Sequence, residues 1–436
     1  MLDFYTLFPM KKSSISLKLI IMNFLQFGIW GAYLTYMGSF LAGAGLGAQI
    51  WLFFATQGFV SIFMPALAGI VADKWIPAQK VLSMCHGFAA LFMLGCGWYA
   101  AQAGANLEFG VFYALYALSI AFYMPTIAIS NSVAYNALEV NGKDPVKDFP
   151  PIRVFGTVGF ICSMLFVNFM RNGQGIQFQH SHEQFLTSGI LGIVLAAYAL
   201  TMPNCPCKPK EAGTQSFAEA TGLIAFKLFK QKKFAIFFVF SMLLGAALQV
   251  TNGYANTFIS SFAENPAYAS TWGANNANAL ISISQISETL CILLIPWAMK
   301  KFRIKGVMLI AMFAWVFRFG FFGLGNPGSG VWLFILSCIV YGVAFDFFNI
   351  SGSLYVEQNA AEDIRSSAQG LFMMMTNGFG ATIGTLAAGA VVDACDVFNT
   401  PTNWPNAWYI FAAYAFVVGV LFWILFKDPN KKAAKA

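Results

Sequence analysis

Charged residues are scarce in this chain of 436 residues. Asp, Glu, Lys and Arg make up only 10% of it, whereas a soluble domain carries about 25%. Apolar residues account for 58% of the chain, and Phe alone contributes 47 residues. This balance excludes a soluble cytosolic enzyme, a disordered protein and a nucleic-acid-binding protein. It indicates a protein that lies largely within a membrane.

The apolar sequence is interrupted only briefly, and the runs between interruptions have the length of membrane-spanning helices. Such a helix needs about 20 apolar residues, and the alternating segments of about ten residues that mark a β-barrel are missing. The sequence therefore predicts an all-α polytopic membrane protein with twelve spans. The expected spans cover residues 18–42, 48–72, 79–101, 109–136, 151–170, 184–202, 234–260, 274–297, 306–326, 330–356, 366–392 and 406–426.

Basic residues are almost absent from every second loop between these runs. All of the 25 Lys and Arg residues except Arg171 and Arg318 fall near the chain ends, in alternate loops, or at the adjoining ends of the spans. Loops rich in Lys and Arg remain on the cytoplasmic side of a membrane. This asymmetry requires an even number of spans and predicts that both termini are cytoplasmic.

The longest basic segment divides the chain near its middle. Its last part, residues 222–233, is Lys-rich and amphipathic, and we expect it to form a short interfacial helix. The sequence at 129–132 is also similar to that at 350–353, which indicates an internal repeat. Duplicated halves with a substrate site at mid-membrane are typical of secondary transporters. The expected domains are an N-terminal six-helix bundle at 1–202, a cytoplasmic linker at 203–233 and a C-terminal six-helix bundle at 234–436.

Groupings typical of catalytic or metal sites are missing from the sequence. The three histidines are His86, His180 and His182, and no Ser/His/Asp or His-x-x-His pattern surrounds them. His86 is expected to be packed or interfacial. Cys205 and Cys207 form a pair without His partners, which is poor support for a metal site. We therefore expect no metal, no cofactor and no enzymatic activity.

Three charged residues lie inside the apolar spans. They are Glu288, Arg318 and Asp346, and Arg153 stands at the inner start of another span. A charge at mid-bilayer costs on the order of 3 kcal/mol, so each one needs an explanation. Arg318 is expected to pair with a carboxylate and lock neighbouring helices. One carboxylate is then left over, and a desolvated carboxylate can hold a proton at neutral pH. Glu288 and Asp346 are therefore the predicted proton-coupling residues.

Polar and aromatic residues recur at helical spacing near these charges. Residues three, four or seven apart share one helix face, and such stripes lie on five of the expected spans. One stripe alone is explained by interhelical hydrogen bonds of about 0.6 kcal/mol, but five stripes predict the lining of one central cavity. The stripes are Gln26–Trp30–Tyr33, Arg153–Thr157–Phe160, Gln249–Asn252–Asn256, Gln285–Glu288 and Tyr341–Phe345 with Asp346 and Asn349.

This lining favours a neutral, hydroxyl-rich and partly planar solute. Carboxamides, hydroxyls and acids donate and accept hydrogen bonds, and aromatic faces stack on flat rings. Arg153 alone does not make a phosphate site, and the sequence has no Gly-rich strand-to-helix loop. On this chemistry a nucleoside and a glycoside remain equally open.

Longer strings of the sequence resemble a known family. The strings at 149–153 (FPPIR), 284–289 (SQISET) and 341–353 (YGVAFDFFNISGS) are similar to those of the bacterial nucleoside:proton symporters of the major facilitator superfamily. The resemblance extends over nearly the whole chain. It implies twelve helices, alternating access and proton-driven import of nucleosides across the bacterial cytoplasmic (inner) membrane. A proton-coupled symporter of a sugar or glycoside is the alternative.

The resemblance also implies the site residues and partners. Glu288 and Asp346 match the acids tied to function in the family. The implied partners are purine or pyrimidine nucleosides, protons and the lipid bilayer, with no nucleic acid, and the protein is expected to be a monomer. The implied substrate-binding residues are Arg153, Thr157, Phe160, Gln249, Asn252, Gln285, Glu288, Tyr341, Phe345 and Asp346.

One short motif resembles a loop found across the superfamily. Residues Gly69 to Lys74 (GIVADK) are similar to the loop between the second and third spans, where an Asp and basic residues latch the two halves on the cytoplasmic face. The sequence departs from the usual form at Pro77 and Ala78. The expected latch residues are Gly69, Asp73 and Lys74.

Overall fold

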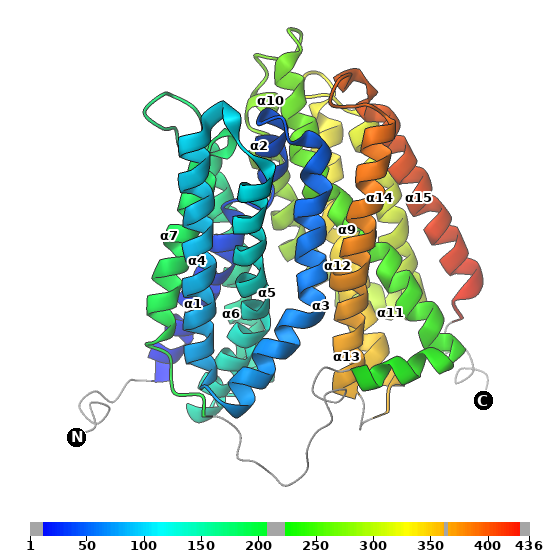
Figure 1. The fold of residues 1–436 in the computed structure, drawn as a ribbon. Helices are drawn as coiled ribbons and strands as arrows, with labels where there is room; N and C mark the ends of the chain where they lie inside the picture. The colour runs from blue at the N-terminus through cyan, green and yellow to red at the C-terminus, as the bar shows by residue number, and fades with distance from the viewer. Residues whose placement is uncertain (1–11, 207–222, 362–364, 428–436) are drawn as a thin grey trace.

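The computed structural model describes residues 12–206, 223–361 and 365–427, which are almost entirely helical (Figure 1). The prediction of an all-α protein is therefore confirmed. Nine stretches of the described chain are long and apolar enough to cross a membrane, and shorter apolar helices lie at Ile15–Gly31 and Glu183–Ala199. The main helices are α1 (Lys12–Gly31), α2 (Met37–Gly43), α3 (Ile50–Lys74), α4 (Ala78–Ala103), α5 (Phe109–Val140), α6 (Pro145–Phe169), α7 (Glu183–Ala199), α9 (Lys232–Ser261), α10 (Trp272–Asn275), α11 (Ala277–Leu324), α12 (Val331–Asn359), α13 (Arg365–Met373), α14 (Ala381–Ala394) and α15 (Trp404–Leu425).

Helix α11 turns back on itself at Arg303. Arg303 has φ 57° and ψ 176°, which no α-helix contains. Beyond the turn, Nη1 of Arg318 donates a hydrogen bond of 3.3 Å to Oγ of Ser284. In a straight helix these residues would be about 50 Å apart at 1.5 Å per residue. The two parts of α11 therefore lie side by side, and they coincide with the two expected runs at 274–297 and 306–326.

The helices pack in two groups that meet along the middle of the molecule. Helices α1, α4, α5, α6 and α7 pack mainly against one another, and α9, α11, α12, α14 and α15 form the other group. Helix α3 contacts α5 of the first group and α14 of the second, α2 contacts α9, and α6 contacts α11 directly. The charged residues of α6, α11 and α12 are thereby brought to the same boundary.

The last part of the expected linker forms a short helix with a buried and an exposed side. Residues Leu223–Lys230 form the 3₁₀ helix η4. Ala225 and Leu228 are buried against the protein, whereas Lys227 and Lys230 are exposed. The rest of the expected linker includes residues 207–222, which lie outside the described residues.

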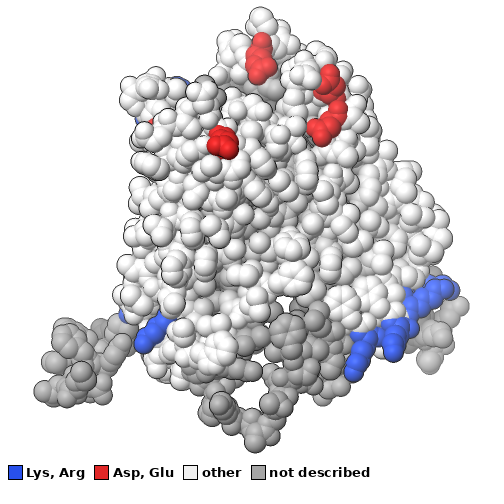
Figure 2. All heavy atoms as spheres, viewed as in Figure 1, with Lys and Arg blue, Asp and Glu red and all other residues white. Residues whose placement is uncertain are grey.

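Charge is separated between the two ends of the molecule. On the face drawn in Figure 2, acidic side chains gather at one end and Lys and Arg at the other, with a wide band between them that carries neither. Helix α1 begins and α15 ends at the basic end (Figure 1). A band without charges between two charged ends is the surface expected of a protein that crosses a bilayer.

Close helix contact depends on particular glycines, and Gly159 in α6 gives a first prediction. A Cβ atom at Gly159 would lie 2.0 Å from the carbonyl oxygen of Phe24 in α1. The Gly159→Ala variant is therefore expected to lose about 1–3 kcal/mol of stability, because overpacking pushes α1 and α6 apart. Thermal unfolding of the purified protein in detergent measures this loss as a lower Tm.

The matched control for this variant is Gly87→Ala in α4. A Cβ at Gly87 meets no atom within 4 Å, and Ala is the better helix former by about 1 kcal/mol. Its Tm should be unchanged or higher. An equal fall of Tm in both variants would contradict the role given to Gly159.

Candidate functional site

Arg153 in α6 presents a positive charge at the boundary between the helix groups. Its guanidinium carbon lies 3.7 Å from the centroid of the Phe27 ring in α1, a cation–π contact. Gly156 leaves room for this arrangement, since a Cβ there would be 2.6 Å from Nη1 of Arg153. Arg153 forms no ion pair with a carboxylate within the described residues. The ring holds the guanidinium in place without neutralising its charge.

Glu288 and Asp346 are placed by the close contact of α11 with α12. Oγ of Ser287 donates a hydrogen bond of 2.5 Å to the carbonyl oxygen of Ile339. A Cβ at Gly342 would lie only 2.5 Å from the Ser287 carbonyl oxygen. The two carboxyl groups interact electrostatically with each other, and Glu288 also interacts with Arg153. The site therefore combines charges from both helix groups.

Asp346 has a carboxyl oxygen that nothing satisfies in the described part of the chain. The residue is 4% exposed, and its Oδ2 has no hydrogen-bond partner there. A buried polar atom without a partner costs about 1–3 kcal/mol. Such an atom is typical of a place that receives a proton, a water molecule or a ligand.

Aromatic rings form a flat wall beside the two acids. The rings of Tyr341 and Phe345 in α12 stack with their centroids 5.7 Å apart and an interplanar angle of 5°. Trp315 stands perpendicular to Tyr341 at 5.9 Å. Gln285 lies within reach of the Tyr341 hydroxyl group. This wall offers a stacking face next to hydrogen-bonding groups, which is the surface that a planar polar solute needs.

Arg318 pairs with no carboxylate in the described part of the chain, so that expectation is wrong. Its Nη1 donates a hydrogen bond of 2.8 Å to the carbonyl oxygen of Ser337, in addition to the one of 3.3 Å to Ser284. Its guanidinium carbon lies 4.4 Å from the centroid of the Tyr341 ring. A backbone carbonyl, a hydroxyl and an aromatic face stabilise the charge in place of an acid. Arg318 therefore joins the two parts of α11 to α12 and supports Tyr341.

Two residues of the stripe on α1, Gln26 and Tyr33, pack within the N-terminal helices and do not line the same cavity, contrary to the expectation. Nε2 of Gln26 donates a hydrogen bond of 2.8 Å to Oγ1 of Thr126, and Oε1 of Gln26 lies 2.7 Å from Nε2 of His86. Tyr33 is buried with its ring edge against Tyr116. These contacts lie within the N-terminal helices, where they join α1 to α4 and α5. His86 is a packed histidine, as expected.

Four predicted site residues have weaker structural support. Thr157 and Phe160 lie on α6 beyond Arg153, and Gln249 and Asn252 lie on α9. None of them makes a hydrogen bond to Glu288 or Asp346 within the described residues. Their part in the site stays a prediction.

Two residues of the site were missed by sequence reasoning. Phe27 makes the cation–π contact with the Arg153 guanidinium, and the Trp315 ring packs edge-to-face with Tyr341. Trp315 lies three residues before Arg318 on one helix face, a spacing that could have drawn attention to it. Phe27 lies four residues after Asn23, but no nearby charge within the apolar run of α1 marks it, so the sequence does not single it out.

The fold is that of the major facilitator transporters. The structure matches that of a D-xylose–proton symporter with a TM-score of 0.69 at 15% sequence identity, over 96% of this chain and 98% of the other. At this identity the likeness concerns the fold alone. The likeness therefore defines the class of fold, and the nine described stretches able to cross a membrane fit a multi-pass membrane protein.

The family follows from closer relatives. A family model described as "Nucleoside H+ symporter" matches residues 13–431, and the chain belongs to this family. It is 44% identical over 424 residues to the xanthosine permease of Escherichia coli K12, covering 96% of this chain and 98% of the permease. A crystal structure of a mutant of the nucleoside transporter NupG matches with a TM-score of 0.88 at 42% identity, over 95% of this chain and 100% of that one. The expected transporter of the nucleoside:proton symporter type is confirmed, and the relatives are transporters and not enzymes, as expected.

Proposed function

We propose that this protein imports nucleosides together with protons by alternating access, and that the ten predicted residues form its transport site. The observation that supports the proposal is that Glu288 on α11 interacts electrostatically both with Arg153 on α6 and with Asp346 on α12, without an ion pair among the described residues. Charges buried without direct partners are costly in a membrane. They are retained where a proton and a polar ligand must bind.

The proposed topology has twelve spans with both termini on the cytoplasmic side of the bacterial inner membrane. The helices described above support it because they overlap all twelve expected runs. The gathering of Lys and Arg at the end where α1 begins supports the orientation (Figures 1 and 2). We further propose that 1–202 and 234–436 move as two bundles of a monomer joined by the linker at 203–233.

The conformation is proposed to be closed toward the outside. Carboxamides connect the two helix groups at the end opposite the start of α1 (Figure 1). Asn168 donates a hydrogen bond of 2.9 Å to Asn276, and Asn278 donates one of 2.7 Å to Gln179. These bonds are neutral, so they can break and re-form without separating charges. The proposed inner latch is Gly69, Asp73 and Lys74 at the end of α3. The side chains of Asp73 and Lys74 lie outside the described residues.

The proposed cycle uses the two acids and the aromatic wall together. Glu288 or Asp346 takes a proton from the outside, and a nucleoside then binds with its ribose hydroxyls on the acids and carboxamides. The base stacks on the aromatic wall beside Phe345. When the two bundles rock, the ligand and the proton leave toward the cytoplasm.

No feature of the site specifically supports the alternative, a symporter of a sugar or glycoside. A pyranose lacks the planar ring that the parallel faces of Tyr341 and Phe345 fit. The likeness to a sugar transporter is one of fold only.

Ligand-induced stabilisation of the purified protein distinguishes the two substrate classes. A ligand at 100 times its Kd stabilises the folded state by about 2.7 kcal/mol. Uridine and adenosine are therefore expected to raise the Tm in detergent, whereas D-xylose and maltose at the same concentration should not. Stabilisation by a sugar but by neither nucleoside would contradict the proposed substrate.

A further inference from the structure

A narrow pocket opens beside Phe345, the residue that precedes Asp346 on α12. It lies between α9, α11, α12 and the π-helix η7 (Met374–Gly380), and the space in it that a water-sized group can enter is about 20 Å³. This is room for about one water molecule or one polar group of similar size. The pocket therefore has the size of a subsite and not of a complete site for a nucleoside.

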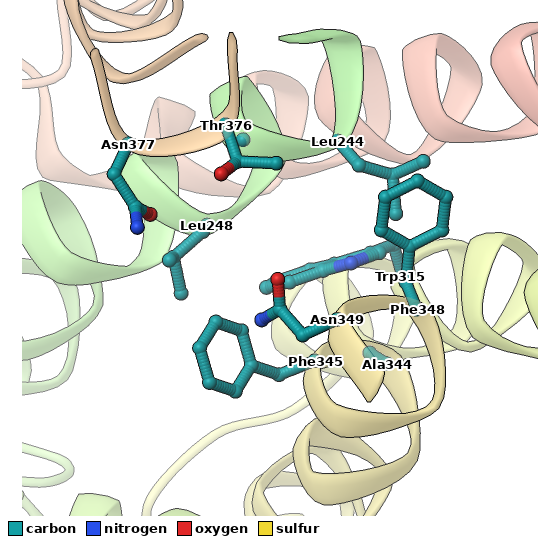
Figure 3. Close-up of a pocket in the computed structure, with 10 residues that line it drawn as sticks. Leu244, Leu248, Trp315, Ala344, Phe345, Phe348, Asn349, Thr376 and Asn377 are labelled. Atoms are coloured by element: carbon teal, nitrogen blue, oxygen red, sulfur yellow. The ribbon is translucent and has the colours of Figure 1, made fainter. Parts of the chain in front are cut away.

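Most of the pocket wall is apolar, with two carboxamides in it. Leu244, Leu248 and Trp315 line it together with Phe345, and Asn349 and Asn377 supply polar groups from α12 and η7 (Figure 3). Figure 3 shows the two carboxamides facing the space beside the Phe345 ring. An apolar wall with a few placed polar groups is the usual composition of a ligand-binding pocket.

Both carboxamides are free to bind a ligand. Neither Asn349 nor Asn377 has a hydrogen-bond partner among the described residues, although both are partly buried. The neighbouring Thr376 differs, because its hydroxyl donates 3.1 Å to the carbonyl oxygen of Phe372. Partly buried Asn side chains normally find partners in the protein or in water, so these two are available to a solute.

The π-helix gives Asn377 a fixed position. Single π-helical turns are rare and occur often at functional sites. Here the turn packs so closely against α9 that a Cβ at Gly245 would lie 2.1 Å from the Thr376 carbonyl oxygen. Asn377, the next residue, is therefore held at a set distance from α9.

We propose that this pocket receives the edge of the nucleobase, and that Asn349 and Asn377 determine which bases are accepted. Asn349 follows Phe345 by four residues on the same helix face, so a base that stacks on Phe345 directs its edge toward Asn349. The inference rests on the proposed function and adds base recognition to it. Neither residue is among the ten expected substrate-binding residues.

The chemistry of a carboxamide explains how one pocket can serve several bases. Each Asn offers two donors and one acceptor, and rotation of its terminal torsion exchanges their places at little cost. The pocket can thus match two different bases. The edge of uracil presents an acceptor, a donor and an acceptor, and the edge of cytosine presents a donor and two acceptors. Aspartate in the same place offers acceptors only and cannot adapt.

The test compares uridine with cytidine, which differ mainly in the order of donors and acceptors on the base edge. Kd values for both are measured on purified wild-type protein and on Asn349→Asp, Asn377→Asp and Asn349→Leu. Each Asp variant is expected to shift the ratio of cytidine affinity to uridine affinity about 3- to 10-fold in favour of cytidine. This factor corresponds to the net free energy of one hydrogen bond. Asn349→Leu should weaken both ligands by a similar factor.

The control is Asn359→Asp, which adds the same charge to α12 outside the pocket. The Asn359 side chain does not line the pocket and donates a hydrogen bond to the Tyr355 carbonyl oxygen. It should leave the ratio unchanged. Unchanged ratios in both Asp variants would overturn the inference while the proposed function stands. If wild-type protein binds neither nucleoside, the proposed function itself fails, and the inference fails with it. Because the two Asp variants lie on different elements, a folding defect in one leaves the other to decide.

Discussion

Proteoliposomes that contain the Glu288→Gln variant are expected to equilibrate uridine without accumulating it. Gln keeps the size and much of the hydrogen bonding of Glu but cannot exchange a proton. With a pH difference of about one unit, symport of one proton supports about tenfold accumulation, since a factor of ten equals 1.4 kcal/mol. The expected accumulation ratio of the variant is therefore close to one.

The expected effect follows from where Glu288 stands. Its carboxyl group interacts with Arg153 from the other helix group and with Asp346 beside it. Loss or gain of its proton changes the attraction between the two groups of helices, which links protonation to their relative movement. A substitution that fixes the group as neutral should leave binding in place and remove the link.

Glu264→Gln is the matched control for this variant. Glu264 is exposed at the outer end, beyond α9, and its replacement should leave tenfold accumulation intact. Asp346→Asn, made alongside, tests whether the neighbouring acid carries part of the coupling. If the double variant of Glu288 and Asp346 still accumulates uridine as the wild type does, proton coupling by these acids is excluded.

The Phe345→Ala variant is expected to lose most of its affinity for nucleosides. Stacking of a base on an aromatic side chain contributes about 1–3 kcal/mol, which corresponds to a Kd about 5- to 150-fold higher. The ring of Phe345 lies parallel to that of Tyr341 and borders the proposed base pocket. Titration of uridine into purified protein, followed calorimetrically, measures the change.

Phe345→Tyr keeps a stacking face and should bind uridine within a few-fold of the wild type. The affinity for ribose alone, which has no base to stack, should be the same in Phe345→Ala as in the wild type. Equal uridine affinity in Phe345→Ala and the wild type would exclude base stacking on this ring.

The sequence predicted the helices well because hydropathy and charge determine them directly. The run at 18–42 is an exception, because the chain leaves the helix between α1 and α2. Its apolar residues continue through this break, so hydropathy could not reveal it. The π-helix η7 was missed for a similar reason, since its i+5 hydrogen bonds leave no mark on the apolar pattern.

The charged residues of the proposed site stand out in the sequence, whereas their neighbours in space do not. A charge within an apolar run is conspicuous, so Glu288 and Asp346, and Arg153 at the start of its span, could be proposed from the sequence alone. The error about Arg318 arose from counting charges, because carbonyl oxygens and ring faces also stabilise a guanidinium. The stripe with Gln26 was misassigned because spacing shows which residues share a helix face but not which neighbour that face meets.

Uptake of radiolabelled uridine into proteoliposomes with an inward proton gradient tests the central claim most directly. Accumulation above the outside concentration, abolished by a protonophore, is the predicted result. Equilibration without accumulation would remove the proton from the mechanism. The absence of saturable uptake of uridine, with adenosine and xanthosine also inert, would contradict the account as a whole.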